Sequence, residues 1–582
     1  MLLRYYARKI INNIVIKVIK PIVFVQYSLP LVILAILLIY HFYIDGSIIL
    51  GGEGDFFIDF ARHSDVYGST WFDIGYGWPN VIPNPVGINN SILVGLLNIF
   101  DNYKVVNFML VFTIYASAYI SFLILAAYLG LSRKESIVIS MLYAIGPFSI
   151  NYLQALNQWN VLSISIMPLL YYLVLRYSYS PFKLFISIGL VTRILSFSLY
   201  NPPTAVIVLS VILIAGLQNM ISKGVVSSQN IVEYFKVIIM AYAGFLVFNL
   251  DWLAVLSYSI QNNYIDAIFT PEFASSWAGA VSSQNELLFR VFSQRQIIAS
   301  NTILDSFYNH TLFVIFLYGF TGLLIIKCAL NRNAVIKLFA FLIVLLIFLT
   351  KGMASPFGAV YLYLMENVPY FYIFKTPTEK FGILLNFLII IALANVISEK
   401  KEFLLKTLTW IFAAFCIIPI VFMDGFAASS DDGNYRMSRR HVFSEDDSKV
   451  INYLTSNYHN MRVLSFPGGL NYQVMIDSKY GVYTGLDPIL SNAHVSYIHP
   501  GLDTEIYKDI FSLDWLHRLQ EKNISAVVYN TKEIPWFGKS IKIGINTLSR
   551  HFIKIGMKEI VIGNYYIWHV PNSGNRVSFE SY

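Results

Sequence analysis

Long apolar runs recur through most of the chain up to residue 423. A helix needs about 20 apolar residues to cross a bilayer, so these runs predict about eleven membrane-spanning helices. The predicted spans are 22–44, 105–131, 136–151, 161–176, 182–200, 203–221, 237–258, 311–328, 335–350, 381–397 and 405–423. Because the spans 136–151 and 161–176 are short, we expect these two to be tilted, broken or re-entrant.

The residues after 423 show the pattern of a small α/β domain. Ser444 is a suitable N-cap because acidic residues fill the turn that follows it. Short runs typical of buried strands follow, and Gly563-Asn564 predicts a hairpin turn. The predicted elements are helices over 444–458 and 513–522 and strands over 462–466, 524–529, 559–562 and 565–570. The sequence therefore predicts an α-helical polytopic membrane domain over 1–423 and an α/β domain over 424–582.

Composition agrees with this division. Hydrophobic residues make up 56% of the chain, charged residues only 13%, and the mean hydropathy is +0.59. A soluble globular protein carries about 25% charged residues. The net charge of +7 does not indicate a nucleic-acid partner, because the tail from Asp424 onward holds 16 acidic and 16 basic side chains. The whole surplus lies in the membrane domain, as positively charged cytoplasmic loops would produce.

The lysines and arginines between the spans predict the orientation. With the N-terminus in the cytoplasm, every inside loop is basic, whereas the outer loops 151–160 and 200–203 carry no Lys or Arg. The inside residues are Arg133, Lys134, Arg176, Lys183, Lys223, Lys236, Lys327, Arg332, Lys337, Lys400, Lys401 and Lys406. An odd number of spans then places the C-terminal domain on the extracytoplasmic side of the cell membrane.

Three predicted outer loops are long, at 45–104, 259–310 and 351–380. Loops longer than about 15 residues are usually functional or disordered. These three are rich in Trp, Tyr, Phe and Pro, which argues against disorder. We expect them to fold back onto the membrane surface as short interfacial helices.

The first outer loop carries carboxylates close to the first span. Glu53 and Asp55 are flanked by glycines, which allow tight backbone turns. A carboxylate there can serve as general base toward an acceptor hydroxyl, or as a ligand of a divalent cation such as Mg²⁺ or Mn²⁺. The alternative is that these are solvated loop acids that cap the next helix.

Aromatic residues follow the acids in the same loop, among them Trp71 and Trp78. Aromatic faces suit the apolar faces of sugar rings, but tryptophans at an interface also anchor proteins in the membrane. Two charges stand out inside predicted spans: Arg193, and Asp251 directly before Trp252. Intramembrane charges are costly and are usually functional or paired, so a functional role and a buried Arg193–Asp251 ion pair both stay open.

The last outer loop departs from the positive-inside pattern with Lys375 and Lys380. Basic residues at the outer membrane surface can bind a lipid phosphate, and Arg295 in the middle loop is a candidate for the same role. Nonspecific contact with lipid headgroups is the alternative.

This layout resembles the GT-C superfamily of membrane glycosyltransferases, and more narrowly its arabinofuranosyltransferase-like and uncharacterised polytopic branches. The stretches that carry the resemblance are 52–55, 71–87, 249–252, 374–380, 462–467 and 523–529. The superfamily takes a sugar from a polyprenyl-phosphate carrier on the outer face. The resemblance therefore implies a polyprenyl-phosphate donor and an essential acid in the first outer loop, Asp55 or, second, Glu53.

The sequence hypothesis is a hexosyl- or pentosyltransferase that acts on an envelope glycan, lipid or protein acceptor. Asp55 would deprotonate the acceptor, and Lys375, Lys380 and Arg295 would hold the donor phosphate. Trp71, Trp78, Asp251 and Trp252 would bind the substrates. The rival hypothesis is a transporter, flippase or envelope-assembly subunit with an outer binding domain, since Arg193 and Asp251 also suit a translocation path.

Overall fold

The structure is a computed structural model of the full chain. It describes residues 21–40, 48–49, 71–72, 78–79, 95, 99–100, 102–149, 158–195, 199, 201–222, 228–261, 271–282, 310–399, 402–422, 437–438, 440–459, 461–466, 473–478, 481–487, 489–490, 492–493, 495–498, 510–532 and 544–571.

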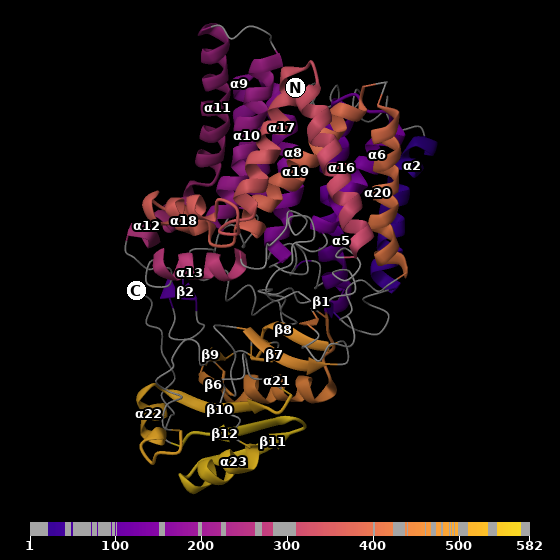
Figure 1. The fold of residues 1–582 in the computed structure, drawn as a ribbon. Helices are drawn as coiled ribbons and strands as arrows, with labels where there is room; N and C mark the ends of the chain where they lie inside the picture. Colours follow the sequence, from indigo (N-terminus) through magenta and orange to yellow (C-terminus); the bar gives the residue numbers. More distant parts are fainter. Residues whose placement is uncertain are drawn as a thin grey trace, which may run out of the picture.

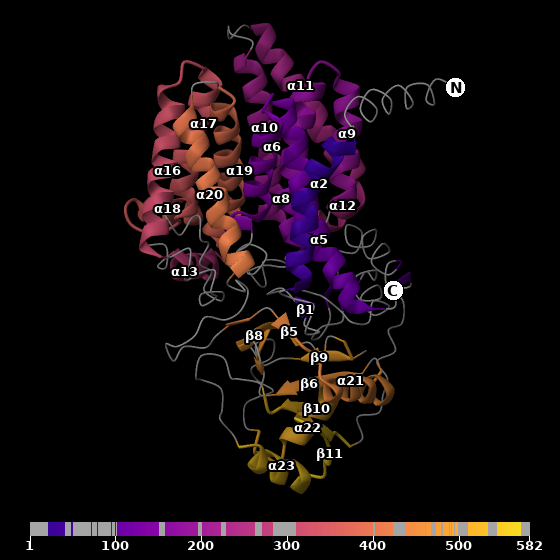
Figure 2. The same ribbon diagram turned by 90° about the vertical axis from the view of Figure 1, so that its right-hand side faces the viewer.

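The described residues form a helical bundle above a small α/β domain (Figure 1). The bundle helices are α2 (Pro21–Leu38), α5 (Tyr103–Tyr128), α6 (Arg133–Ile145), α8 (Gln158–Tyr177), α9 (Pro181–Ile194), α10 (Pro202–Ser222), α11 (Ser228–Phe248), α16 (Thr311–Leu330), α17 (Ala334–Thr350), α19 (Pro377–Ile397) and α20 (Phe403–Phe422). Turned by 90°, the molecule shows α16, α17 and α20 on one side of the bundle and α5, α8 and α9 on the other (Figure 2).

Each predicted span overlaps a helix, but the predicted count of about eleven is not confirmed. Within the described ranges, five helices are long and apolar enough to cross a membrane: α5, α10, α11, α16 and α19. Four further helices contain shorter apolar stretches, at Gln26–Leu38, Leu162–Tyr177, Ala334–Thr350 and Phe403–Ile418. Helix α6 has 13 residues, which at about 1.5 Å per residue is well short of a bilayer's hydrocarbon thickness.

Short helices lie across the end of the bundle that faces the α/β domain, which we call the domain end. They are α12 (Leu250–Gln261), α13 (Pro271–Ser282) and α18 (Gly358–Asn367), followed by the 3₁₀ turn η4 (Phe371–Phe374) (Figure 1). Helices α13 and α18 fall in the second and third of the long loops predicted to fold back onto the membrane surface. The predicted orientation makes the domain end the outer face.

The opposite end of the bundle gathers loops that the sequence predicts to be cytoplasmic. Lys406 Nζ lies 2.8 Å from Glu135 Oε1, and Lys327 Nζ lies 3.0 Å from Glu402 Oε2. Arg133 donates a hydrogen bond to Gln26 of α2 at 2.6 Å. These contacts hold the starts of α2, α6 and α20 and the end of α16 at one end. Which side of the membrane that end faces stays a prediction.

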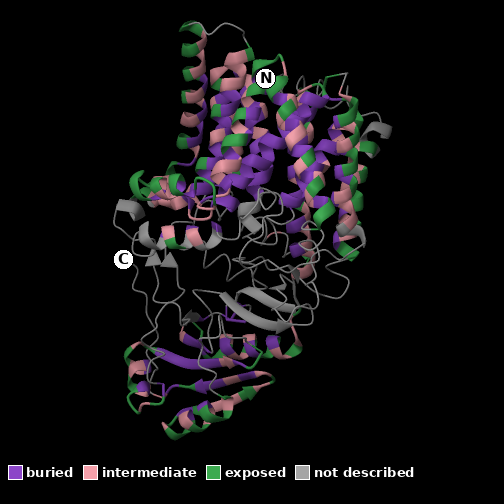
Figure 3. Ribbon diagram, viewed as in Figure 1, coloured by how far each residue is buried: buried purple, intermediate pink, exposed green. Residues whose placement is uncertain are grey.

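Helix α19 is the centre of the bundle (Figure 3). It contacts α17, α10, α16, α6 and α8, and 94% of the residues in its most apolar 18-residue stretch are buried. Its Phe387 ring packs edge-on against the rings of Phe122, Tyr143 and Tyr171 from three other helices. A helix apolar all round is expected at such a central position.

Helices α9 and α11 pack closely because glycines lie between them. A Cβ atom on Gly244 of α11 would collide with the carbonyl oxygen of Phe185, and one on Gly189 of α9 would collide with the Phe248 ring. The backbones therefore approach at the two glycines, as small residues allow in membrane helices.

Replacing Gly244 with alanine should loosen this packing. The new methyl group meets backbone, which cannot rotate away, so we expect destabilisation of about 1–3 kcal/mol. The measurement is the midpoint of thermal unfolding in detergent. Gly319→Ala on α16, where nothing lies within 4 Å of the added Cβ, is the matched control and should lower the midpoint little or not at all. Equal losses in both variants would contradict the close-packing interpretation.

The α/β domain is built on a five-stranded sheet of order β11-β12-β10-β6-β9. The strands are β6 (Arg462–Phe466), β9 (Ser496–Ile498), β10 (Ile524–Asn530), β11 (Lys558–Ile562) and β12 (Tyr565–His569). Strands β9, β6 and β10 are parallel, and β12 runs antiparallel to β10 and β11. A second sheet has the order β4 (Met437–Ser438), β8 (Gly481–Leu486), β7 (Gln473–Ser478).

Helices cover both faces of the five-stranded sheet. Helix α21 (Glu445–Asn457) packs Val450 and Leu454 on one face, together with Val528 of β10. Helices α22 (Trp515–Glu521) and α23 (Ile545–Lys554) pack on the other face, together with Val527. Neighbouring strand residues point to opposite faces, which explains why β10 supplies both cores.

The predicted elements of this domain are confirmed with small shifts at their ends. Ser444 caps α21: its Oγ accepts the Asp447 amide at 3.1 Å, and its own amide donates to Asp447 Oδ2 at 2.7 Å. The predicted hairpin forms as β11 and β12, with Gly563 at a φ of 55° in its turn. Strands β4, β7, β8 and β9, the two-residue strand β5 (Arg440–His441) and helix α23 were not predicted.

Candidate active site

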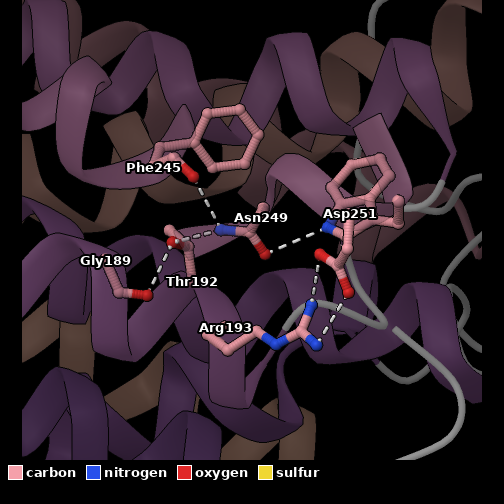
Figure 4. A network of polar contacts seen from close by, with 7 residues as sticks. Gly189, Thr192, Arg193, Phe245, Asn249 and Asp251 are labelled. Carbon is pink, nitrogen blue, oxygen red and sulfur yellow. Dashed lines mark hydrogen bonds and ion pairs between the residues drawn. The ribbon is translucent and has the colours of Figure 1, made fainter. Parts of the chain in front are cut away.

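A polar network joins α9 to the junction of α11 and α12 (Figure 4). Asn249 lies at the break between α11 and α12 and is fully buried. Its Nδ2 donates to Thr192 Oγ1 at 3.0 Å and to the Phe245 carbonyl at 2.8 Å, and its Oδ1 accepts from Trp252 Nε1 at 3.0 Å. One amide therefore fixes both the end of α11 and the first turn of α12.

Arg193 and Asp251 form an ion pair beside this network (Figure 4). Both guanidinium NH₂ groups donate to the carboxylate, one to each oxygen, at 2.9 Å. The pairing considered from the sequence is thus confirmed, although the two side chains are 25% and 37% exposed rather than buried. A partly exposed bidentate ion pair of this kind fixes the relative orientation of its two side chains more than it stabilises the fold.

The predicted span 237–258 is corrected by the same contacts. Helix α11 begins nine residues earlier, at Ser228, and ends at Phe248. The apolar run continues past Asn249, but the chain turns there because its side chain bonds back to α11 and across to α9. Asp251 therefore lies in the first turn of the surface helix α12 rather than within a span.

Trp252 was predicted to bind substrate. Its side chain is only 2% exposed, and its ring packs edge-on against Phe245 with centroids 6.3 Å apart. In this conformation Trp252 is a core residue that holds α12 against α11.

The first turn of α19 contains a second charged pair, Glu379 and Lys380. Both side chains are buried, at 8% and 7% exposure, and the Lys380 ammonium contacts the Glu379 carboxylate. Glu379 is suited to the start of a helix, where the helix dipole favours an acid. A buried ionisable pair in a membrane domain is costly and is a functional candidate by default.

Polar contacts hold the surroundings of this turn in place. Thr378 Oγ1 donates to the Thr350 carbonyl at the end of α17, at 3.2 Å. Ser282 at the end of α13 accepts the Met353 amide at 2.9 Å. The start of α19 is thus enclosed by α13 and the end of α17.

Aromatic residues of η4 form the other wall. The rings of Phe374 and Phe381 stack at 4.9 Å, Phe371 packs against both, and the Tyr361 hydroxyl donates to the Phe374 carbonyl at 2.7 Å. Lys375 lies between η4 and α19 and is half-buried. The two lysines predicted to bind phosphate are five residues apart in the sequence, and in the structure both lie at the start of α19.

The remaining predicted site residues are only partly described. Glu53, Asp55 and Arg295 lie outside the described residues, and only the backbones of Trp71 and Trp78 are described. Strand β2 (Trp71–Phe72) pairs antiparallel with β3 (Trp78–Pro79), with Trp71 opposite Pro79 and Phe72 opposite Trp78. The two tryptophans thus lie in neighbouring residue pairs of one short two-stranded sheet.

A metal ion was an open question in the sequence analysis. Within the described ranges, no group of three or more His, Cys, Asp or Glu side chains is gathered to hold one. Glu53 and Asp55, whose carboxylates were considered from the sequence either as a general base or as one ligand of such an ion, lie outside those ranges.

Sequence reasoning named Asn249 only as part of a short motif and gave no role to Thr192. The available signal was a polar amide inside an otherwise apolar run, three residues before a tryptophan. Such an amide needs hydrogen-bond partners in a membrane helix, and here it finds them on α9.

The fold is that of a solved membrane protein. The structure superimposes on single-particle cryo-EM structures of arabinofuranosyltransferase AftD from mycobacteria. One superposition has a TM-score of 0.58 at 12% identity, covering 94% of this chain and 40% of AftD. Another, with a mutant of AftD, has a TM-score of 0.59 at 13% identity, covering 93% and 41%.

This chain has the AftD fold. The resemblance to GT-C glycosyltransferases of the arabinofuranosyltransferase-like branch is thereby confirmed at the level of fold. The chain spans about two fifths of the AftD chain, so the match covers one part of that longer protein. No family model and no curated protein matches the sequence.

Proposed function

We propose that the protein is a membrane glycosyltransferase that transfers a sugar from a polyprenyl-phosphate carrier to an acceptor on the outer face of the cell membrane. The observation that carries the proposal is the AftD fold, which extends over 94% of this chain. Charged side chains held at the domain end, at α12 and at the start of α19, support it.

In the proposed reaction, the acceptor is an envelope glycan, a lipid or a protein. Asp55, with Glu53 as the second candidate, takes the proton of the acceptor hydroxyl. The acceptor oxygen attacks the anomeric carbon, the bond from that carbon to the phosphate oxygen breaks, and polyprenyl phosphate leaves. Positioning and one base suffice because the phosphate is a good leaving group. A divalent cation at these acids belongs to the same proposal, and no step above depends on it.

The donor would lie with its lipid tail along the bundle and its phosphate at the start of α19. Lys375 and Lys380 supply positive charge there, and the dipole of α19 places its positive end at the same point. Lys380 is already paired with Glu379, so donor binding would exchange one anionic partner for another or add a second. Arg295 is a further candidate for the phosphate.

Release of polyprenyl phosphate from a panel of polyprenyl-phosphate sugars tests the proposal. We expect the purified protein to release it, and Asp55→Asn to lower the rate by about 10²–10⁴-fold, the usual contribution of a general base. Glu53→Gln is the matched variant, and a smaller loss there would assign the base to Asp55. Unchanged turnover in the Asp55→Asn, Glu53→Gln double variant would refute the assignment of the acids. A protein that binds donors and never releases the carrier would favour the transporter hypothesis.

A further inference from the structure

A short antiparallel pairing connects the start of the first outer loop to the α/β domain. Strand β1 (Ile48–Ile49) follows α2, and β5 (Arg440–His441) precedes α21. Ile48 pairs with His441, and Ile49 pairs with Arg440. Two segments almost 400 residues apart in sequence therefore meet at the domain end (Figure 2).

The same segment also contacts the other end of that loop. Two residues after β5, the Phe443 ring packs edge-on against Tyr103, the first residue of α5, with centroids 6.2 Å apart and planes at 82°. Helix α5 also contacts β1 directly. Residues 440–443 thus touch the chain where it enters the loop, at β1, and where it returns, at Tyr103.

Phe443 belongs to two cores at once. It packs against the membrane-domain core and against the core under α21 of the α/β domain. The next residue, Ser444, is the N-cap of α21, so no free linker separates this contact from the domain. The contact made by residues 440–443 is therefore directly continuous with the α/β domain.

We propose that the α/β domain positions the acid-bearing loop through residues 440–443, with Phe443 as the positioning residue. This inference rests on the proposed function in one respect, the role of Glu53 and Asp55. Those acids follow Ile49 by four and six residues in the sequence. Fixing both ends of the loop restricts where its acids can lie relative to α12 and α19.

The strand pairing can be tested by crosslinking in native membranes. Paired residues of antiparallel strands have Cα atoms about 4.5–5.5 Å apart, a separation that a disulfide spans. In a background with Cys328 and Cys416 replaced by alanine, we expect a disulfide in Ile48→Cys/His441→Cys or in Ile49→Cys/Arg440→Cys. The control is Ile48→Cys/Ser438→Cys, because Ser438 pairs with Tyr483 of β8 instead. Crosslinking no faster than in this control would overturn the proposal.

The positioning role needs a readout that does not depend on activity. In Phe443→Ala, we expect amide hydrogen exchange within residues 50–102 to accelerate by tenfold or more, while exchange in α22 and α23, on the opposite face of the sheet, stays unchanged. Phe511→Ala, which removes a half-exposed ring elsewhere on the same domain, should leave residues 50–102 as they are. Equal exchange of residues 50–102 in wild type and Phe443→Ala would overturn the proposal.

Enzyme kinetics separate this inference from the proposed function. If the protein is a transferase, Phe443→Ala should lower kcat at least tenfold with little change in KM for the donor. If no donor turns over while the crosslink and the exchange difference are both found, positioning of the loop stands and the transferase proposal fails. A transferase whose kcat is the same in Phe443→Ala contradicts the positioning role alone.

Discussion

Lys380→Met should destabilise the membrane domain by about 3–5 kcal/mol, because it leaves the Glu379 carboxylate buried without its cation. The methionine side chain is of similar length and fills the same space, so the loss reports the charge rather than a cavity. Thermal unfolding in detergent measures it. Lys449→Met provides the contrast, since its i,i+4 partner Glu445 is 83% exposed and such surface pairs contribute little to stability.

The double variant Glu379→Gln/Lys380→Met distinguishes a structural pair from a functional one. Replacing both members of a buried ion pair is often neutral, so stability should return to near the wild-type value. If Lys380 also binds the donor phosphate, the stable double variant should still bind the donor at least tenfold more weakly. Full stability together with wild-type donor affinity would show that the pair serves the fold alone.

The apolar runs were sufficient to predict helices but not to count spans. Runs such as 203–221 and 311–328 became α10 and α16 almost residue for residue. The run 237–258 did not form one helix. Its hydropathy carries no information about hydrogen bonds, and the hydrogen bonds of the Asn249 side chain end α11. Length decides whether a helix can span, and α6 and α9 have only 13 and 14 residues.

Local signals also explain which parts of the α/β domain were predictable. Ser444 with Asp447 three residues later is a capping box, and the structure contains it. Strands β7 and β8 escaped prediction because they mix polar and apolar residues and end in a sheet with the remote strand β4. Pairing between distant segments, as in β1 with β5, leaves no local signal.

The contacts of the candidate site were likewise predictable from the sequence only in part. The sequence separated charged candidates from the apolar background, and Arg193–Asp251 pair as one of its alternatives stated. It did not predict that Lys380 would contact its neighbour Glu379, since adjacent residues normally point to different faces of a helix. The two side chains contact each other because both are buried, and their burial depends on the packing of the whole bundle, which the local sequence does not show.

The α/β domain should be more stable at pH 5 than at pH 7.5. Burial, with a smaller contribution from the nearby Asp447 carboxylate, raises the pKa of Asp487 from 3.8 to about 6, although hydrogen bonds from the amides of Leu490 and Ile489 and from Ser465 lower it. The folded state therefore holds a proton that the unfolded state releases above pH 3.8. This contribution is fully present below about pH 4 and is lost as the pH rises through about 6.

The size of the effect follows from the two pKa values. Between pH 7.5 and pH 5 the gain is about 1 kcal/mol, roughly a tenfold rise in amide protection of β6 and α21 once intrinsic exchange rates are corrected. His551 opposes it, because burial lowers its pKa and its share of stability is lost as the pH falls. Asp487→Asn is the matched variant, since its amide oxygen can still accept the bonds from Ile489 and Leu490. The variant should show only the opposing slope of His551, and a variant that keeps the wild-type pH dependence would place the proton on another group.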